Sequence, residues 1–228
     1  MRLDRRSALI GGAAAAAGLA APRIARAETA ERVFRIVRDG SDIGEHVIAA
    51  SRTGDACEVS IDIAIAVKVL GITAYRYEMV NNERWRGGRL VSLDSRVNDD
   101  GEQRETRATR RGDGLVVEGP DFSGPAPLDA ATTIYLTRAF LDRDDWIATD
   151  GGELYDVRVD DLGAQGADAA YGGVPCTRYR VTNGDEYTVE LEYDDRGEWV
   201  GLAFDASGEP ATYRAESVGA RLAALWAG

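Results

Sequence analysis

Apolar and polar residues alternate over long stretches of this chain, and this period of two predicts β-strands. The clearest stretch runs from Cys57 to Leu70. Its polar and small residues share one face, and its β-branched residues share the other: Ile61, Ile63, Ile65, Val67 and Val69. A strand of this kind covers a hydrophobic core on one side only.

Segments with the same character recur along the chain, among them Ile72 to Arg86, Glu102 to Arg111 and Tyr187 to Tyr193. Most are separated by short turns rich in Gly and Asp, and short connections join antiparallel neighbours. We count about eleven strands in this way. A sheet of that size curls or closes on itself. The sequence therefore predicts one mainly β domain over residues 28–228, built as a single antiparallel curved sheet or partly open β-barrel.

One segment interrupts the strands. Pro120 to Pro127 breaks the alternation, and the following stretch from about Ala130 to Leu141 looks helical, with apolar candidates at Ile134, Leu136 and Phe140. We expect a short helical insert at about 130–141, able to cover the mouth of the curved sheet. A second short helix is expected from Val218 to Trp226.

The first 27 residues have the features of a cleavable export signal. Arg5 and Arg6 lie in a basic start, an apolar run shorter than a membrane span follows, and Ala25 and Ala27 form a small-x-small cleavage site. The paired arginines resemble a twin-arginine signal. We therefore expect the export machinery as a partner of this signal and a mature chain from Glu28 without a transmembrane anchor. The expected location is periplasmic or secreted, in a bacterium.

Composition narrows the classes of partner. The chain holds 27 Lys+Arg against 39 Asp+Glu, a net charge of −12, and five of the arginines lie in the expected signal. Such an acidic excess argues against nucleic acid and anionic lipid surfaces, because both attract basic patches. Hydrophobic residues make up 44% of the chain, which is enough for a packed core and argues against an acidic disordered chain.

Several segments resemble a known family: Trp85 to Leu90, Gly114 to Gly119, Tyr155 to Val159 and Tyr193 to Leu202. In these segments, and from about Phe34 to Tyr213 as a whole, the chain resembles the exported bacterial proteins grouped as domain of unknown function 6134. The resemblance implies an exported, β-rich protein. It implies no activity, and no catalytic residue is carried over from the family.

Residues suited to catalysis are scarce. His46 is the only histidine, and a general base needs a positioned partner and a nucleophile. No Gly-x-Ser-x-Gly segment marks a serine nucleophile, and no acidic cluster has calcium-loop spacing. We therefore predict no catalytic residue, cofactor or metal site and favour a protein that is not an enzyme. For Cys57 and Cys176 two alternatives stay open, a disulfide or two separately buried thiols.

Aromatic residues on the predicted strands either pack in the core or line a concave ligand surface: Tyr75, Tyr77, Trp85, Tyr187, Tyr193 and Trp199. An exported curved sheet with an insert over its mouth favours a binding or carrier protein for an apolar or lipid-like small molecule. One alternative is an envelope interaction or scaffold protein that acts through its acidic surface. Another is a hydrolase, which would depend on His46 as its base.

Overall fold

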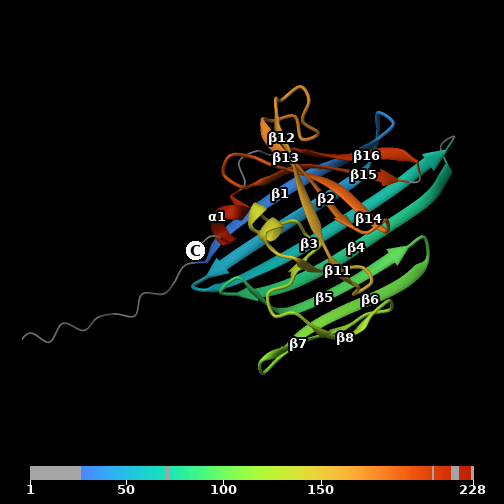
Figure 1. Ribbon diagram of the computed structural model, residues 1–228. Coiled ribbons are helices and arrows are strands. Elements are labelled where there is room, and N and C mark those ends of the chain that lie inside the picture. Colours follow the sequence, from blue (N-terminus) through green and yellow to red (C-terminus); the bar gives the residue numbers. More distant parts are fainter. Residues whose placement is uncertain (1–26, 70–71, 207, 217–220, 227–228) are drawn as a thin grey trace, which may run out of the picture.

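Thirteen antiparallel strands form one strongly curved sheet, which we call the cradle (Figure 1). The computed structural model describes residues 27–69, 72–206, 208–216 and 221–226. The strands of the cradle are β1 (Glu28–Arg38), β2 (Ser41–Thr53), β3 (Ala56–Val69), β4 (Ile72–Arg86), β5 (Arg89–Asp99), β6 (Glu102–Arg111), β7 (Gly114–Glu118), β8 (Ser123–Ala126), β12 (Arg158–Gln165), β13 (Cys176–Asn183), β14 (Tyr187–Tyr193), β15 (Trp199–Ala206) and β16 (Glu209–Ala215).

The strand order is β12-β13-β14-β15-β16-β1-β2-β3-β4-β5-β6-β7-β8. Neighbours in the sheet are neighbours in the chain except at one place, where β1 pairs with β16 from Phe34↔Ala215 to Arg38↔Ala211. Short turns make the hairpins between them. Between β1 and β2, Asp39 (φ 48°) and Gly40 (φ 70°) both have positive φ, which suits a tight two-residue hairpin turn. The edge strands β12 and β8 do not pair, so the sheet stays open, and the expectation of a single curved antiparallel sheet is confirmed.

Alternation along β3 gives the cradle its two faces, as the sequence predicts. Val59 and Ile61 are buried on the concave face, whereas Asp62 and Ala64 are exposed on the convex face. The cross-strand partners carry this pattern across the sheet, because His46 and Ile63 pair with each other and Ile63 pairs with Met79. Each long strand therefore presents one set of side chains to the hollow of the cradle and one to the outside.

Residues 127–157, which we call the insert, fill much of that hollow (Figure 1). The insert contains a small sheet ordered β11-β10-β9 and one short helix. Its elements are β9 (Ala131–Thr132), the 3₁₀-helix η1 (Arg138–Asp142), β10 (Asp145–Ile147) and β11 (Leu154–Asp156).

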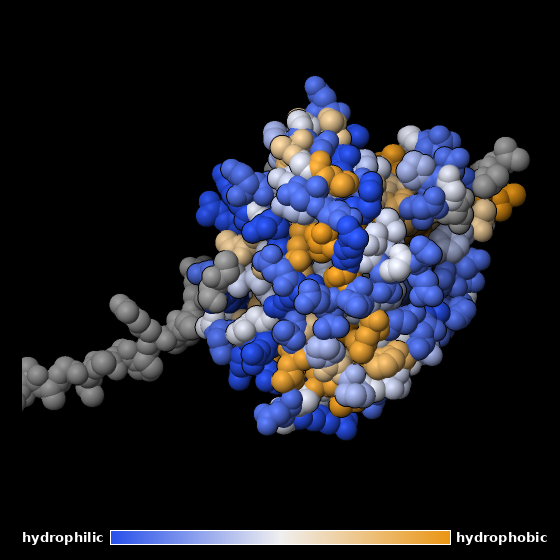
Figure 2. Space-filling model, in the orientation of Figure 1, coloured by the Kyte–Doolittle hydropathy of each residue, from blue (hydrophilic) through white to orange (hydrophobic). Residues whose placement is uncertain are grey.

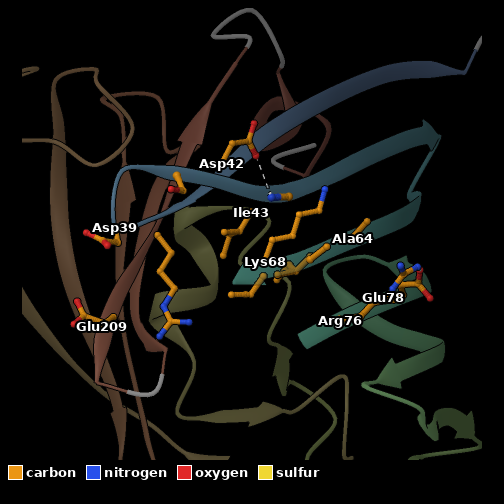
Figure 3. Close-up of a pocket in the computed structure, with 14 residues that line it drawn as sticks. Asp39, Asp42, Ile43, Ala64, Lys68, Arg76, Glu78 and Glu209 are labelled. Atoms are coloured by element: carbon orange, nitrogen blue, oxygen red, sulfur yellow. Dashed lines mark hydrogen bonds and ion pairs between the residues drawn. The ribbon is translucent and has the colours of Figure 1, made fainter. Parts of the chain in front are cut away.

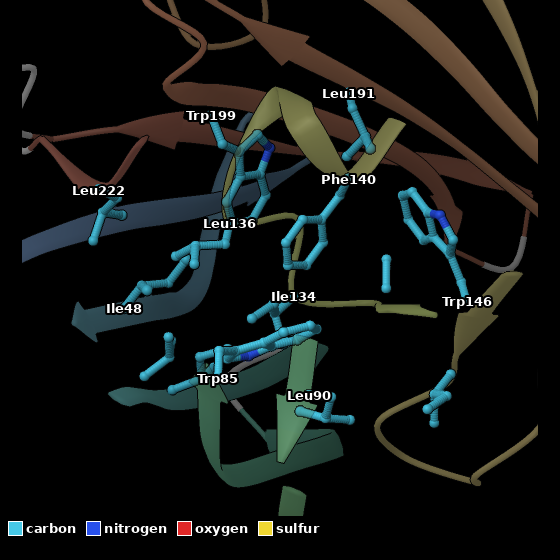
Figure 4. Close-up of a cluster of buried hydrophobic side chains, with 14 of the residues drawn as sticks. Ile48, Trp85, Leu90, Ile134, Leu136, Phe140, Trp146, Leu191, Trp199 and Leu222 are labelled. Atoms are coloured by element: carbon cyan, nitrogen blue, oxygen red, sulfur yellow. The ribbon is translucent and has the colours of Figure 1, made fainter. Parts of the chain in front are cut away.

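The main hydrophobic core lies between the insert and the two walls of the cradle (Figure 4). From the insert come Ile134, Leu136, Phe140 and Trp146, all buried. They pack against two walls of the cradle. Ile48, Trp85 and Leu90 belong to the wall formed by the first strands, and Leu191 and Trp199 belong to the wall formed by the last strands. The insert is therefore an interior layer of the fold.

The expected helical insert is only partly correct. Helical structure is limited to η1, which overlaps the end of the predicted segment, and the residues before it are extended or in turns. Two features oppose a longer helix. Thr132 lies in β9, which pairs in parallel with β10, and Tyr135 has a positive φ of 54°, which no α-helix accommodates. At the C-terminal end the expected helix appears as α1 (Leu222–Trp226).

The export signal lies outside the described residues, and with it Arg5, Arg6 and Ala25. Ala27 is the first described residue, and β1 begins directly after it at Glu28. The cleavage site and the division of the chain at residue 28 stay predictions.

Candidate functional site

The hairpin of β3 and β4 is longer than its neighbour. Pairing of β2 with β3 ends at Gly44↔Ile65, whereas pairing of β3 with β4 continues to Val69↔Ile72. We call the part beyond Ile65 the overhang, comprising residues 66–69 of β3 and 72–76 of β4. Because β2 turns away at this point, a notch opens at this end of the cradle, which we call the open end.

A groove of about 650 Å³ occupies the notch (Figure 3). We call it the rim groove. Ile43, Ile65 and Val67 supply its apolar side chains, and all three are half-buried. Gly44 lets the strands approach closely here, because a Cβ on this residue would overlap the carbonyl oxygen of Ala64. The volume lies in the range of small-molecule sites.

Charged residues of both signs surround the rim groove. Asp39 and Glu209 stand on one side of it, and Arg76 and Glu78 stand on the other (Figure 3). Arg76 pairs with Glu78 at 3.3 Å. In the described part of the chain Lys68, a further residue of the lining, forms no ion pair. Arg38 and Asp42 also belong to the lining, and the opposite charges give the groove no strong field of one sign.

Among the side chains that the structure describes, large hydrophobic ones are exposed on a single strand of the cradle. They are Ile72 (74% exposed), Tyr75 (37%) and Val80 (44%), all on β4. Tyr75 lies opposite Val67, so it continues the apolar side of the rim groove toward the end of the overhang. Ile72 and Tyr75 belong to the overhang beside the groove, whereas Val80 lies in mid-sheet.

The six aromatic residues expected near a ligand separate into two groups. Trp85, Tyr193 and Trp199 are fully buried, and Trp85 packs against Phe140 and Trp226 at ring distances of 5.4 and 4.9 Å. These three belong to the core. Tyr187 also contacts the protein itself, because its hydroxyl lies 2.6 Å from that of Tyr135 in the insert.

Tyr75 and Tyr77 are the two expected aromatic residues that lie at the open end, opposite Val67 and Ile65. Burial raises the pKa of Tyr77, and its hydroxyl lies 3.6 Å from the sulfur of Met79. Sequence alternation places all six aromatic residues on strands and assigns them a face. It does not tell which of them the insert covers, and so the rim groove itself was not anticipated.

His46 lies in an aromatic enclosure on the concave face. Its ring centre is 5.4 Å from that of Trp199 and 5.6 Å from that of Tyr213, and burial lowers its pKa to about 3. Neither ring nitrogen has a hydrogen-bond partner among the described residues. The imidazole is therefore neutral and sealed from solvent, and the structure gives it neither of the partners that a general base requires.

A second buried polar group, which the sequence analysis did not single out, joins the cradle to the insert. The carboxylate of Glu83 on β4 accepts hydrogen bonds from Asn81 (3.0 Å), the Trp85 indole (2.7 Å) and Thr132 of β9 (3.1 Å). Burial raises the pKa of Glu83 to about 7, although these three hydrogen bonds act in the opposite direction. Two polar residues at inward positions between Met79 and Trp85 were the available sequence signal.

Cys57 and Cys176 are both buried free thiols, so the structure lacks the disulfide that was one of the two alternatives. They lie on β3 and β13, which have five other strands between them in the sheet order. Burial raises the pKa of both, that of Cys176 to about 11, which leaves the thiols protonated at neutral pH. Within the described ranges no group of three or more His, Cys, Asp or Glu side chains is placed to hold a metal ion.

Comparison with known proteins agrees with the β-rich fold. Residues 34–216 match the family described as domain of unknown function DUF6134. The chain belongs to this family. The match covers most of the cradle and the whole insert.

A structural neighbour of the DUF6134 chain is a crystal structure described as a β-barrel-like protein of domain of unknown function DUF1849 from Brucella abortus. It is 8% identical in sequence, with a TM-score of 0.54 over 82% of this chain and 95% of that one. At this identity the likeness concerns the fold alone. No curated protein matches the chain. None of the helices in the described ranges has the length and apolar character needed to cross a bilayer.

Proposed function

We propose that this DUF6134 protein is an exported binding or carrier protein that holds an apolar or lipid-like ligand in the rim groove. The observation that carries the proposal is the groove of about 650 Å³ with apolar side chains from Ile43, Ile65 and Val67 at the open end. Its volume suits a small molecule or one acyl chain. The insert occupies the rest of the hollow, so the ligand lies at the open end and not deep in the cradle.

The chemistry of the rim groove supports binding more than catalysis. A catalytic site brings together a nucleophile or base and groups that orient it. His46, the base on which a hydrolase would depend, lies sealed among aromatic rings and does not line the groove. The charged side chains at the groove are exposed residues whose neighbours include charges of opposite sign.

The first test is native mass spectrometry of the exported protein purified from cells, followed by solvent extraction. The proposal expects a discrete added mass that extracts as an apolar compound. The second test measures binding of the neutral apolar dye N-phenyl-1-naphthylamine by fluorescence. Val67→Asn places an amide in the groove and should weaken dye binding about tenfold, because the amide must be desolvated.

Val47→Asn is the matched control. Val47 is half-buried on the convex face of β2, opposite Asp62, and does not line the rim groove. Its dye affinity should equal that of the unaltered protein. Equal dye affinity in both variants, together with no added mass on the native protein, would reject the rim groove as a ligand site.

A second candidate function, an envelope interaction protein, is favoured by a separate hollow on the convex face. This hollow measures about 700 Å³ and is lined largely by small and polar side chains of β1 to β5, among them Ala49, Ser51 and Ser60. A protein partner that uses it should be captured by the unaltered protein and lost when Ser60→Arg fills the hollow. Capture that is the same with Ser60→Arg would remove this candidate.

A further inference from the structure

The overhang ends in the most exposed large hydrophobic residue that the structure describes. Ile72 is 74% exposed and Tyr75 37% exposed, and both lie on the part of β4 that projects beyond the end of β2. Figure 2 shows hydrophobic residues at the edge of the molecule beside the grey atoms of this hairpin. Residues 70 and 71 lie outside the described part and are not used in the argument.

Two basic residues alternate with these apolar residues along the overhang. Lys68 on β3 pairs with Thr73 of β4, and Arg76 follows Tyr75. Lys68 is the only lysine in the sequence, in which every other basic side chain except His46 is an arginine. From the end of the overhang the order is Ile72, Lys68, Tyr75 and Arg76. Apolar, aromatic and long basic side chains occur together at a lipid–water interface, where the basic side chains extend toward the headgroups.

Acidic residues limit how deep such contact can go. Burial raises the pKa of Tyr75, and Asp99, in the last position of β5, lies beside it and raises this pKa further. Asp100 accepts a hydrogen bond from the backbone N–H of Arg76 at 3.3 Å. These carboxylates offset the basic residues and oppose approach to an anionic surface. Both carboxylates lie at Tyr75 and Arg76, and Ile72 lies beyond them toward the end of the overhang.

We propose that the overhang docks on a lipid surface of little net charge, with Ile72 and Tyr75 inserted into the interface and Lys68 and Arg76 at headgroup level. The hydrophobic effect drives this contact, because the local charges largely cancel. Docking there places the mouth of the rim groove next to the lipid. The contact does not depend on whether the groove holds a ligand.

The test is sedimentation of the full chain with phosphatidylcholine vesicles. Ile72→Ser should weaken partitioning about tenfold, because it removes one large apolar side chain from the interface. Ile72→Trp should retain or strengthen it, since Trp favours this region of a bilayer. Val80→Ser is the matched control, because Val80 is 44% exposed on the same strand but faces outward in mid-sheet, and it should bind as the unaltered protein does.

The single lysine provides an independent readout. Reductive methylation of Lys68, measured by peptide mass spectrometry, should slow when vesicles are present. All variants carry the same N-terminus, so any vesicle binding by the N-terminal segment cancels in the comparison. Raising the salt concentration should leave binding unchanged or strengthen it.

Three results would overturn the proposal. One is equal partitioning of Ile72→Ser and Val80→Ser. Another is binding confined to anionic vesicles and abolished by salt. The third is Ile72-dependent self-association without vesicle binding, which would assign the overhang to a contact between two copies. Val67→Asn separates the two proposals, because it should lose dye binding and keep vesicle binding.

Discussion

The two ends of strand β4 lie in opposite environments, one in the buried core and one exposed to solvent. At its end, Trp85 is buried against Phe140 and Trp226 under the guanidinium of Arg143, whereas at its start Ile72 is 74% exposed. Between these two ends the inward side chains become more buried, from exposed Tyr75 through half-buried Tyr77 to buried Met79. The concave face continues over this whole length, with the polar side chains of Asn81 and Glu83 among the apolar ones, and the difference in exposure comes from what covers it.

The insert covers one end only. It is fastened to the first wall by the hydrogen bond between Thr132 and Glu83 and by Arg143, which donates to the carbonyl of Gly88 at 2.5 Å. It is fastened to the second wall by Tyr135 and Tyr187. At the open end the side chains of Ile65 and Val67 stay half-buried. The position at which the insert ends therefore sets the boundary between the buried core and the rim groove.

The largest expected effect lies in the covered end. Phe140→Ala removes a buried ring between Trp85 and Trp226 and leaves a cavity, so it should lower the free energy of unfolding by about 3–5 kcal/mol. Val67→Ala, at the half-buried open end, should cost about 1 kcal/mol or less. Urea unfolding measures both values. Similar losses in the two variants would show that the ends are packed alike.

The second-largest expected effect is that of pH on the contact between Glu83 of the cradle and Thr132 of the insert. The pKa of Glu83 in the folded protein, about 7, lies above its ordinary value of 4.5, so folding favours the protonated carboxyl. The stability it contributes is complete below pH 4.5 and is lost as the pH rises through about 7, a change of about 3 kcal/mol. Glu83→Gln cannot ionise, so its stability relative to the unaltered protein should rise over this range.

Urea unfolding at several values between pH 5 and pH 8 tests this expectation. Other carboxyls whose pKa is raised, such as those of Asp145 and Glu198, titrate in both proteins and cancel in the difference. Parallel pH profiles for the two proteins would contradict a raised pKa at Glu83.

The smallest effect concerns the second wall. Tyr187→Phe removes one partner of the 2.6 Å hydrogen bond to Tyr135 and should lower the free energy of unfolding by about 1 kcal/mol. Tyr179→Phe is the matched control, because Tyr179 packs against Tyr193 and its hydroxyl makes no hydrogen bond within the described residues. The same thermal denaturation midpoint for both variants would mean that the hydroxyl pair does not hold the insert.

The long strands were predictable, since a period of two survives wherever one face is buried. The limits of β4, β6 and β14 agree with the sequence prediction, and β3 differs from it by one residue at each end. The short strands β8, β9 and β10 have no more than four residues each, too few for a period to appear. In the insert, burial on all sides removes the polar face that distinguishes a helix from a strand.

The candidate site was less accessible to sequence reasoning. Tyr75 and Tyr77 were among the expected ligand neighbours, yet Trp85 shares their face and lies in the core. Position relative to the insert separates them, and that depends on contacts between residues far apart in the chain. The close approach at Gly44 and the early end of β2 have the same origin. A local sequence pattern therefore predicts neither the close approach at Gly44 nor the early end of β2.

The pairing of β1 with β16 has a consequence for synthesis of the chain. The first strand of the cradle borders the last one, so on the ribosome Phe34 emerges long before Ala215, its partner across the sheet. Until then one edge of β1 exposes unpaired backbone groups, which other strands can join. A chain that stops short of β16 lacks a central strand, so the sheet becomes continuous only after β16 has been synthesised.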